Sequence, residues 1–259
     1  MFYNCYGLTS LNLTPFNTAK VTNMGSMFYN CSRLTSLDLT PFNTAKVTNM
    51  FQMFGNCPGL TSLDLTPLDT ANVTDMGSMF YNCSRLASLD LTSLNTQNVT
   101  NMGSMFYNCY GLTSLNLTPL NTQNVTDMSS MFDGCSGLTS LDLTSLNTQN
   151  VTNMNGMFAG CSMTSLDLTS FDTAKVTNMG YMFSGCSVTS LDLTSFDTAK
   201  VTNMGGMFGC YGLTTIKTGT TFKFAGTNYN LPGTWRNTAG KTFTSGTFPS
   251  NVADTYTKI

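Results

Sequence analysis

Residues 27–52 read MFYNCSRLTSLDLTPFNTAKVTNMFQ, and close copies of this stretch fill most of the chain. Its opening pair, Met-Phe, recurs in steps of 26 residues and then in two steps of 25. The pair begins at Met1, Met27, Met53, Met79, Met105, Met131, Met157, Met182 and Met207. A fixed period in this range is typical of a solenoid, in which stacked units bury together the apolar faces that one unit cannot bury alone.

Within one unit, the spacing of apolar residues predicts a short strand followed by a helical segment. Residues 34–40 place Leu37 and Leu39 in alternation, which predicts a strand with both leucines inward. The next apolar residues are Val47, Met50, Phe54 and Cys57. Their spacing of three, four and three favours a short helix or helical turn that buries one side. We therefore expect one short parallel strand and one short helix or helical turn per unit of 25–26 residues.

The chain divides into the repeats, residues 1–216, and a different segment, residues 217–259. The repeats make about eight units and a partial ninth. The later segment begins within residues 214–224, a stretch rich in β-branched and aromatic residues that predicts a final strand region, and we expect a β-rich cap over the last unit. The expected core residues of this cap are Phe222, Phe224, Trp235 and Phe243. Met1 already occupies the Met-Phe column, so we expect the signal and anchor of the natural protein to lie outside this segment.

Composition excludes several classes of function. Charged residues make up 9% of the chain and the net charge is −2, with no basic stripe, so we expect no nucleic-acid partner. No apolar run is long enough to span a bilayer. The chain has no histidine and no motif that pairs a nucleophile with a base, so we expect neither an enzyme nor a bound cofactor.

The repeat pattern resembles a known family. The spacing Leu34-x-x-Leu37-x-Leu39, within the Met-Phe and Val-Thr-x-Met frame, is similar to the BspA-type leucine-rich repeat of bacterial surface proteins. The resemblance covers residues 1 to about 216, and the segment 219–259 is similar to one that often follows such arrays. It implies a leucine-rich-repeat-like solenoid, secreted or attached to the cell wall, that adheres to host, matrix or microbial surfaces. The resemblance implies no catalytic residues in this chain.

One cysteine per unit forms a column with three interpretations. Its members are Cys5, Cys31, Cys57, Cys83, Cys109, Cys135, Cys161, Cys186 and Cys210. A ladder of buried free thiols is the favoured one, since cysteine packs as a small apolar residue. Disulfides between neighbouring units are the second, although an odd number leaves one thiol over. A metal site is the third, and it is disfavoured because the chain has no Cys-x-x-Cys pair and no histidine.

Two sets of polar residues are candidates for ligand contact. The first set alternates with the inward leucines and therefore points outward: Ser36, Asp38, Thr40, Ser62, Asp64, Thr66, Ser88, Asp90 and Thr92. An ordinary solvated face and a row of weak cation sites are the alternatives for this set. The second set is Tyr29, Tyr81 and Tyr107, which follow the Met-Phe pair where other units vary, as exposed residues do. Exposed tyrosine favours protein or glycan recognition.

Three functions fit these features. The first is a non-enzymatic, extracellular or cell-surface protein that adheres to a host, matrix or microbial protein or glycan. The second is a structural solenoid that self-associates through its uncapped first unit. The third is an ice-binding protein that uses the regular threonine columns, which the neighbouring aspartates disfavour.

Overall fold

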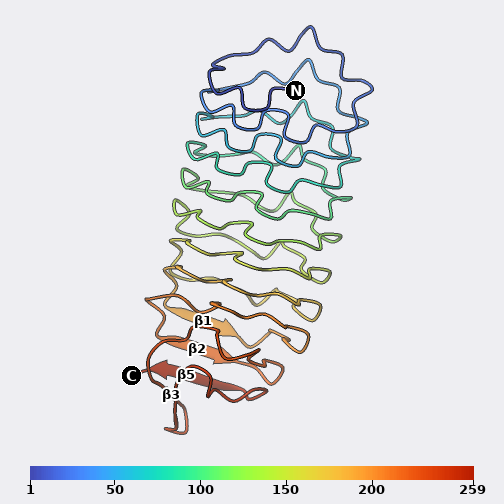
Figure 1. The fold of residues 1–259 in the computed structure, drawn as a ribbon. Helices are drawn as coiled ribbons and strands as arrows, with labels where there is room; N and C mark the ends of the chain where they lie inside the picture. Colours follow the sequence, from blue (N-terminus) through green and yellow to red (C-terminus); the bar gives the residue numbers. More distant parts are fainter.

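The computed structural model describes residues 1–259 as a stack of rungs, one per repeat unit, that ends in a small β-sheet (Figure 1). The strands are β1 (Ser190–Leu193), β2 (Thr215–Thr218), β3 (Trp235–Asn237), β4 (Thr242–Phe243) and β5 (Asp254–Lys258). β1 pairs in parallel with β2, and β5 lies antiparallel between β2 and β3, with β4 at the edge. The repeat solenoid predicted from the 26-residue period is present.

The predicted helix in each unit is wrong, because the Met-Phe side of every rung is a series of tight turns. In residues 102–109, alternate backbone N–H groups donate to carbonyls of the next rung at 2.7–3.0 Å. Between them, the N–H groups of Met105, Tyr107 and Cys109 donate to the carbonyl three residues back in the same rung, and that of Gly103 donates to Oδ1 of Asn101. Ser104 and Asn108 have φ of +56° and +55°, which no right-handed helix allows. The backbone therefore divides its hydrogen bonds between its own rung and its neighbour.

The predicted strand in each unit is also wrong for most rungs, although the inward position of its leucines is confirmed. Leu37 and Leu39 are buried, whereas the residues that alternate with them are exposed. Only β1 and β2, in the last two rungs, pair along this side over four residues. Earlier rungs are joined there by isolated bonds, such as that from Thr61 N–H to the Thr35 carbonyl at 3.2 Å.

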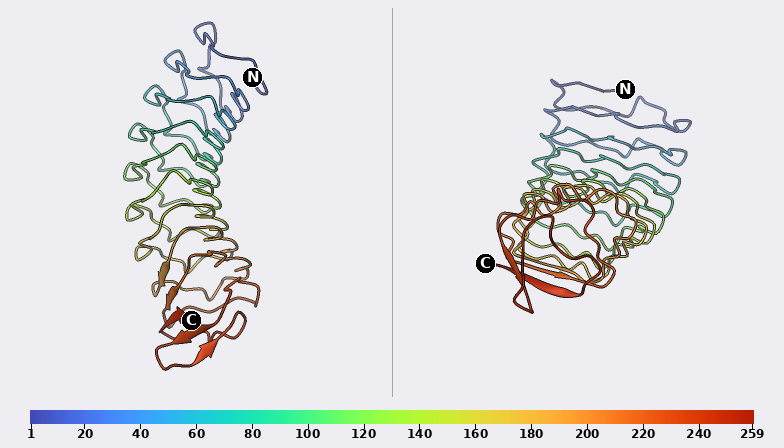
Figure 2. Two further views of the ribbon diagram at one scale, coloured as in Figure 1. Left: turned by 90° about the vertical axis from the view of Figure 1, so that its left-hand side faces the viewer. Right: turned by 60° about the horizontal axis from the view of Figure 1, so that its bottom comes forward.

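The regular parallel contact between rungs lies elsewhere, in an Asn/Asp column just before the Met-Phe side. It runs through Asn23, Asn49, Asp75, Asn101, Asp127, Asn153, Asn178 and Asn203. Neighbouring rungs are close along this side and spread apart on the other. Figure 2 (left) shows the result, which is an arc with narrow spacing along one side and protruding loops along the other.

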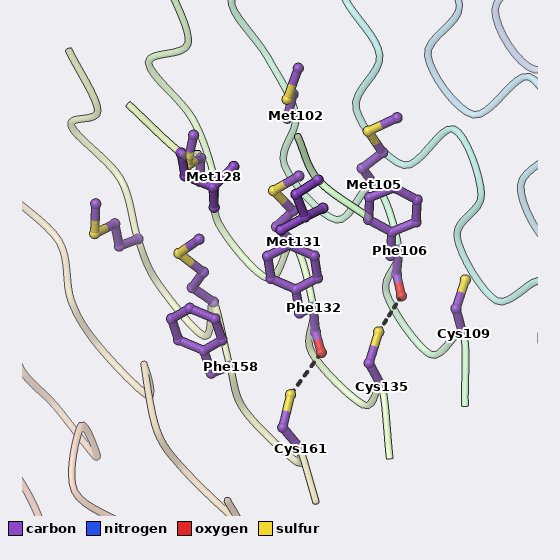
Figure 3. Packing of buried hydrophobic residues seen from close by; sticks show 14 of the residues in the cluster. Met102, Met105, Phe106, Cys109, Met128, Met131, Phe132, Cys135, Phe158 and Cys161 are labelled. Atoms are coloured by element: carbon purple, nitrogen blue, oxygen red, sulfur yellow. Dashed lines mark hydrogen bonds between the residues drawn. The ribbon is translucent and has the colours of Figure 1, made fainter. Parts of the chain in front are cut away.

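Repeated side chains form continuous ladders in the core (Figure 3). The phenylalanine rings from Phe2 to Phe183 stack at centroid distances of 5.6–6.1 Å and within 11° of parallel. All nine cysteines are free thiols, and all but Cys5 are buried. The thiol of Cys135 donates to the carbonyl of Phe106 at 3.0 Å, and the same contact recurs between other rungs. Each cysteine thus satisfies a carbonyl on the ring ladder.

A column of buried threonines makes a second ladder, on the opposite side of the unit from the cysteines. Its members are Thr18, Thr44, Thr70, Thr96, Thr122, Thr148, Thr173 and Thr198. The hydroxyl of Thr96 donates to the carbonyl of Asn121 at 3.0 Å and accepts the N–H of the same residue at 2.7 Å. One hydroxyl therefore satisfies two backbone groups of the next rung.

The C-terminal segment covers the last rung. Its aromatic side chains Phe222, Phe224, Trp235 and Phe243 are all buried, as expected from the sequence. Cross-strand neighbours Ile216 and Tyr256 lie beneath the sheet with them. The structure contains no helix with the length and apolar character that a membrane crossing requires.

Candidate functional site

The outward residues of the leucine segments form one polar surface, which we call the Asp face. It consists of Ser36, Asp38, Thr40 and the equivalent residues of the other rungs. All nine residues that the sequence analysis named here are exposed: Ser36, Asp38, Thr40, Ser62, Asp64, Thr66, Ser88, Asp90 and Thr92. The structure brings them into three parallel columns along the stack, because each rung repeats the same turn.

Each aspartate of the Asp face is held by the threonine two residues later. Oδ1 of Asp38 accepts the hydroxyl of Thr40 at 2.7 Å and its backbone N–H at 2.9 Å. These two hydrogen bonds lower the pKa of Asp38 below its ordinary value. In Asp64, the same donors from Thr66 outweigh the repulsion of Asp38 and Asp90. The face therefore presents a row of ionised, fixed carboxylates at neutral pH.

The three candidate tyrosines lie on the Met-Phe side of the rungs, away from the Asp face. Tyr81 and Tyr107 stack at 4.8 Å, and Tyr29 stacks on Tyr3 at 5.2 Å. Because each ring covers its neighbour, Tyr29, Tyr81 and Tyr107 are half-buried, whereas the sequence predicted exposed residues. Gly55 separates the two pairs, which we call the Tyr pairs.

Asp133 follows Tyr107 in the tyrosine column and has an unusual charge state. Burial raises its pKa to about 6, and a weak hydrogen bond from the Ser130 hydroxyl, at 3.4 Å, only partly offsets this. Its ionised form is therefore disfavoured by the fold. Asp133 is also the only acidic residue in its column, which is the signal in the sequence that could have identified it.

We expect Asp133→Asn to raise the melting temperature at pH 7.5 and to have little effect at pH 4. The folded pKa of about 6 lies above the ordinary 3.8, so the folded state holds the proton more tightly than the unfolded state. Stability due to this group is full at low pH and is lost as pH rises through about 6. Thermal unfolding as a function of pH measures the effect. Asp38→Asn is the control with the opposite sign, since it removes a charge that the fold favours.

Tyr181 is an exposed aromatic residue that the sequence analysis missed. It is 56% exposed and has φ of +56°, a conformation that bulky residues rarely adopt. Its column holds Ser, Gln or Gly in the other rungs, and that departure was the available signal. Its ring lies over Gly206, where an added Cβ would meet it at 2.6 Å. Strain of this kind often accompanies function, so we add Tyr181 to the candidate contact residues.

Gly206→Ala is expected to lower the free energy of unfolding by about 1–2 kcal/mol, because φ there is +66° and the new methyl group meets the Tyr181 ring. The cost should fall in a Tyr181→Gly background, where only the backbone strain remains. A double-mutant cycle in urea measures the difference. Equal costs in both backgrounds would mean that the ring does not lie on Gly206.

The structure gathers no cluster of side chains that could hold a metal ion. No three His, Cys, Asp or Glu side chains converge on one point. All the cysteines except Cys5 are buried, and burial raises the pKa of Cys57 and Cys135 to about 12. What the surface offers instead is fixed carboxylates, stacked phenols and amide groups at regular intervals, which suits non-covalent recognition.

This arrangement defines a repeat solenoid whose outward chemistry recurs from rung to rung. The chain belongs to the family described as "Mycoplasma protein of unknown function, DUF285", which matches residues 1–118 and 109–217. No protein with curated annotation matches it significantly. Among solved structures, it is similar to a leucine rich cell surface protein from Faecalibacterium prausnitzii A2-165, with 16% identity over 73% of this chain and 68% of that one. The TM-score is 0.24, so the two chains do not superpose as wholes.

Proposed function

We propose that this chain is a non-enzymatic binding protein of the cell surface or extracellular space, which adheres to a protein or glycan through its Asp face and Tyr pairs. The observation that carries the proposal is the exposed, hydrogen-bonded aspartate of the Asp face, repeated on successive rungs. Fixed acceptors at a regular spacing allow one extended ligand to make the same contact many times, so weak contacts add up. The likeness of the repeats to BspA-type surface proteins supports the same role.

The geometry of the threonines favours adhesion over ice binding. The hydroxyls of Thr40 and Thr66 donate to aspartate carboxylates within their own rungs. Their protons are thus engaged, and the adjacent carboxylates are charged, so the face is a poor match for an ice lattice.

A binding array of host, matrix and microbial proteins and glycans tests the proposal, using the full chain. For any ligand that binds, Asp64→Asn combined with Asp90→Asn should weaken affinity about tenfold or more, as expected for lost hydrogen bonds to charged groups. Asn116 and Thr118 already make the same turn in this column, so the substitution preserves the backbone.

The matched control is Asp69→Asn combined with Asp172→Asn. Both residues are exposed and lie in a different column from Asp64 and Asp90, in which most other rungs carry Asn. Their replacement changes net charge equally and should leave affinity nearly unchanged. Equal losses in the two double variants, or no ligand in a broad array, would count against the proposal. Concentration-dependent assembly without a ligand would favour a self-associating solenoid.

A further inference from the structure

Charge is distributed unevenly along the chain. Twelve of the thirteen acidic residues precede position 217, and only Asp254 lies in the C-terminal segment. Five of the eleven basic residues lie in that segment: Lys217, Lys223, Arg236, Lys241 and Lys258. An acidic stack therefore ends in a basic cap, so the two parts attract ligands of opposite charge.

The outward face of the C-terminal sheet continues the Asp face with this opposite charge. Asp192 of β1 lies beside Lys217 of β2, which in turn lies opposite Thr255 of β5. Two residues further along β5, Thr257 lies opposite Arg236 of β3. Cross-strand partners point to the same face of a sheet, and the alternate residues beneath are buried. Lys217, Arg236 and two threonines thus share one solvent-facing surface.

A shallow cavity of about 270 Å³ lies on this surface. It is lined by Arg236, Asn237, Thr238, Thr255, Thr257 and Ile259. A second cavity of about 290 Å³ adjoins it, sharing Thr238 and Thr255, and reaches Lys217 and Asp254. The volume of the Arg236 cavity suits a single sugar ring or the end of a polymer chain, because pockets for drug-sized ligands begin at about 300 Å³.

Three side chains of the first cavity, those of Arg236, Thr255 and Thr257, have unused hydrogen-bonding capacity, whereas the charged groups of the second cavity are paired. Arg236 has no carboxylate within ion-pair distance, and its guanidinium makes no hydrogen bond. The hydroxyls of Thr255 and Thr257 likewise bond to no protein atom. In the adjoining cavity, Lys217 pairs with Asp192 at 3.1 Å.

The carboxylate of Asp254 is also fully engaged. It accepts bonds from the Asn237 amide, the Thr238 hydroxyl and the Thr255 N–H. Its charge is therefore compensated locally, and these bonds keep its pKa below the ordinary value. Of the two cations that line these adjoining cavities, Arg236 is the one without an ion pair, and the free hydroxyls of Thr255 and Thr257 lie beside it.

We propose that the Arg236 cavity binds the carboxylate of an acidic sugar. The planar guanidinium matches a carboxylate in a two-bond fork, and the hydroxyls of Thr255 and Thr257 can donate to or accept from sugar hydroxyls. The acidic Asp face repels an acidic sugar. We therefore expect this ligand to bind at the cap and not along the stack. This site is separate from the adhesive surface proposed above and does not depend on it.

Isothermal titration of the full chain with a trimer of galacturonic acid tests the proposal. Arg236→Ala should weaken binding about tenfold or more, and Arg236→Lys should retain part of the affinity because the charge remains without the fork. The methyl ester of the trimer keeps the rings but loses the charge, and should bind at least about tenfold more weakly. Lys223→Ala is the matched control. It removes an exposed cation of the cap outside this cavity, and affinity should stay within about twofold.

Absence of binding, equal binding of the methyl ester, or full affinity in Arg236→Ala would overturn the proposal. Tighter binding of an oligoglutamate peptide than of the uronate would also overturn it, by indicating an acidic-peptide site. Circular dichroism of each variant checks that the cap is folded. Asp64→Asn combined with Asp90→Asn should leave uronate binding intact, so failure of the adhesive surface and failure of the cap site give different results.

Discussion

Phe106→Ala is expected to lower the free energy of unfolding by about 3–5 kcal/mol. The Phe106 ring is fully buried and lies between Phe80 at 5.8 Å and Phe132 at 5.9 Å. Its removal opens a cavity at the centre of the ladder and deprives two neighbouring rungs of a contact each. Because a repeat protein is held together by contacts between neighbours, the loss falls on two interfaces at once. Urea unfolding followed by circular dichroism measures it.

Two controls separate the ladder from general effects of losing an aromatic ring. Tyr110→Ala removes a ring that is 54% exposed and should change stability by no more than about 0.5 kcal/mol. Phe106→Leu keeps most of the volume and should cost less than about 1.5 kcal/mol. A cost below about 1 kcal/mol for Phe106→Ala would show that the ring ladder does not hold the rungs together.

The sequence predicted the stack and its core because both follow from a local rule repeated at a fixed period. A column that is apolar in every unit, such as that of Met27 and Met53, is buried in every rung after the first. The alternation of Leu37 and Leu39 with Asp38 identified the exposed face in the same way. Neither inference depended on how the backbone made its hydrogen bonds.

The error over the helix has a physical explanation. The spacing of Val47, Met50 and Phe54 suits one side of a helix, but turns of three to four residues produce the same spacing. The distinguishing signal lies in the columns of Gln52 and Asn56. Most residues in these columns are Ser, Asn or Gly, and Asn and Gly tolerate positive φ and favour turns over helix interiors.

Two further features depended on long-range geometry that no single unit encodes. Whether the leucine segments pair as strands depends on the spacing between rungs. The curvature of the stack makes this spacing wide on the side of the leucine segments. The proposed cap site joins Arg236 and Thr257, which are distant in sequence and meet only because β5 pairs with β3. Their proximity depends on the strand order of the sheet, which could not be predicted from the sequence of the segment.

The buried threonine ladder gives the second large prediction, which is that Thr96→Val lowers the free energy of unfolding by about 2–4 kcal/mol. Valine has nearly the same shape, so packing is preserved and the effect reports hydrogen bonding alone. Without the hydroxyl, the N–H and the carbonyl of Asn121 both lose their partner, which is the buried side chain of Thr96. Each unsatisfied buried group costs about 1–3 kcal/mol. Urea unfolding of the variant measures the sum.

Thr66→Val is the matched control, since Thr66 also donates a hydroxyl hydrogen bond, to Asp64 at 2.7 Å, but is exposed. Water replaces that bond, so the change should be within about 0.5 kcal/mol. Thr96→Ser keeps the hydroxyl and loses one methyl group, and should cost only about 1 kcal/mol. Equal costs for the valine variants at positions 96 and 66 would contradict the expectation. The pattern predicted here would show that the rungs are joined by a polar ladder on one side of the core and an aromatic ladder on the other.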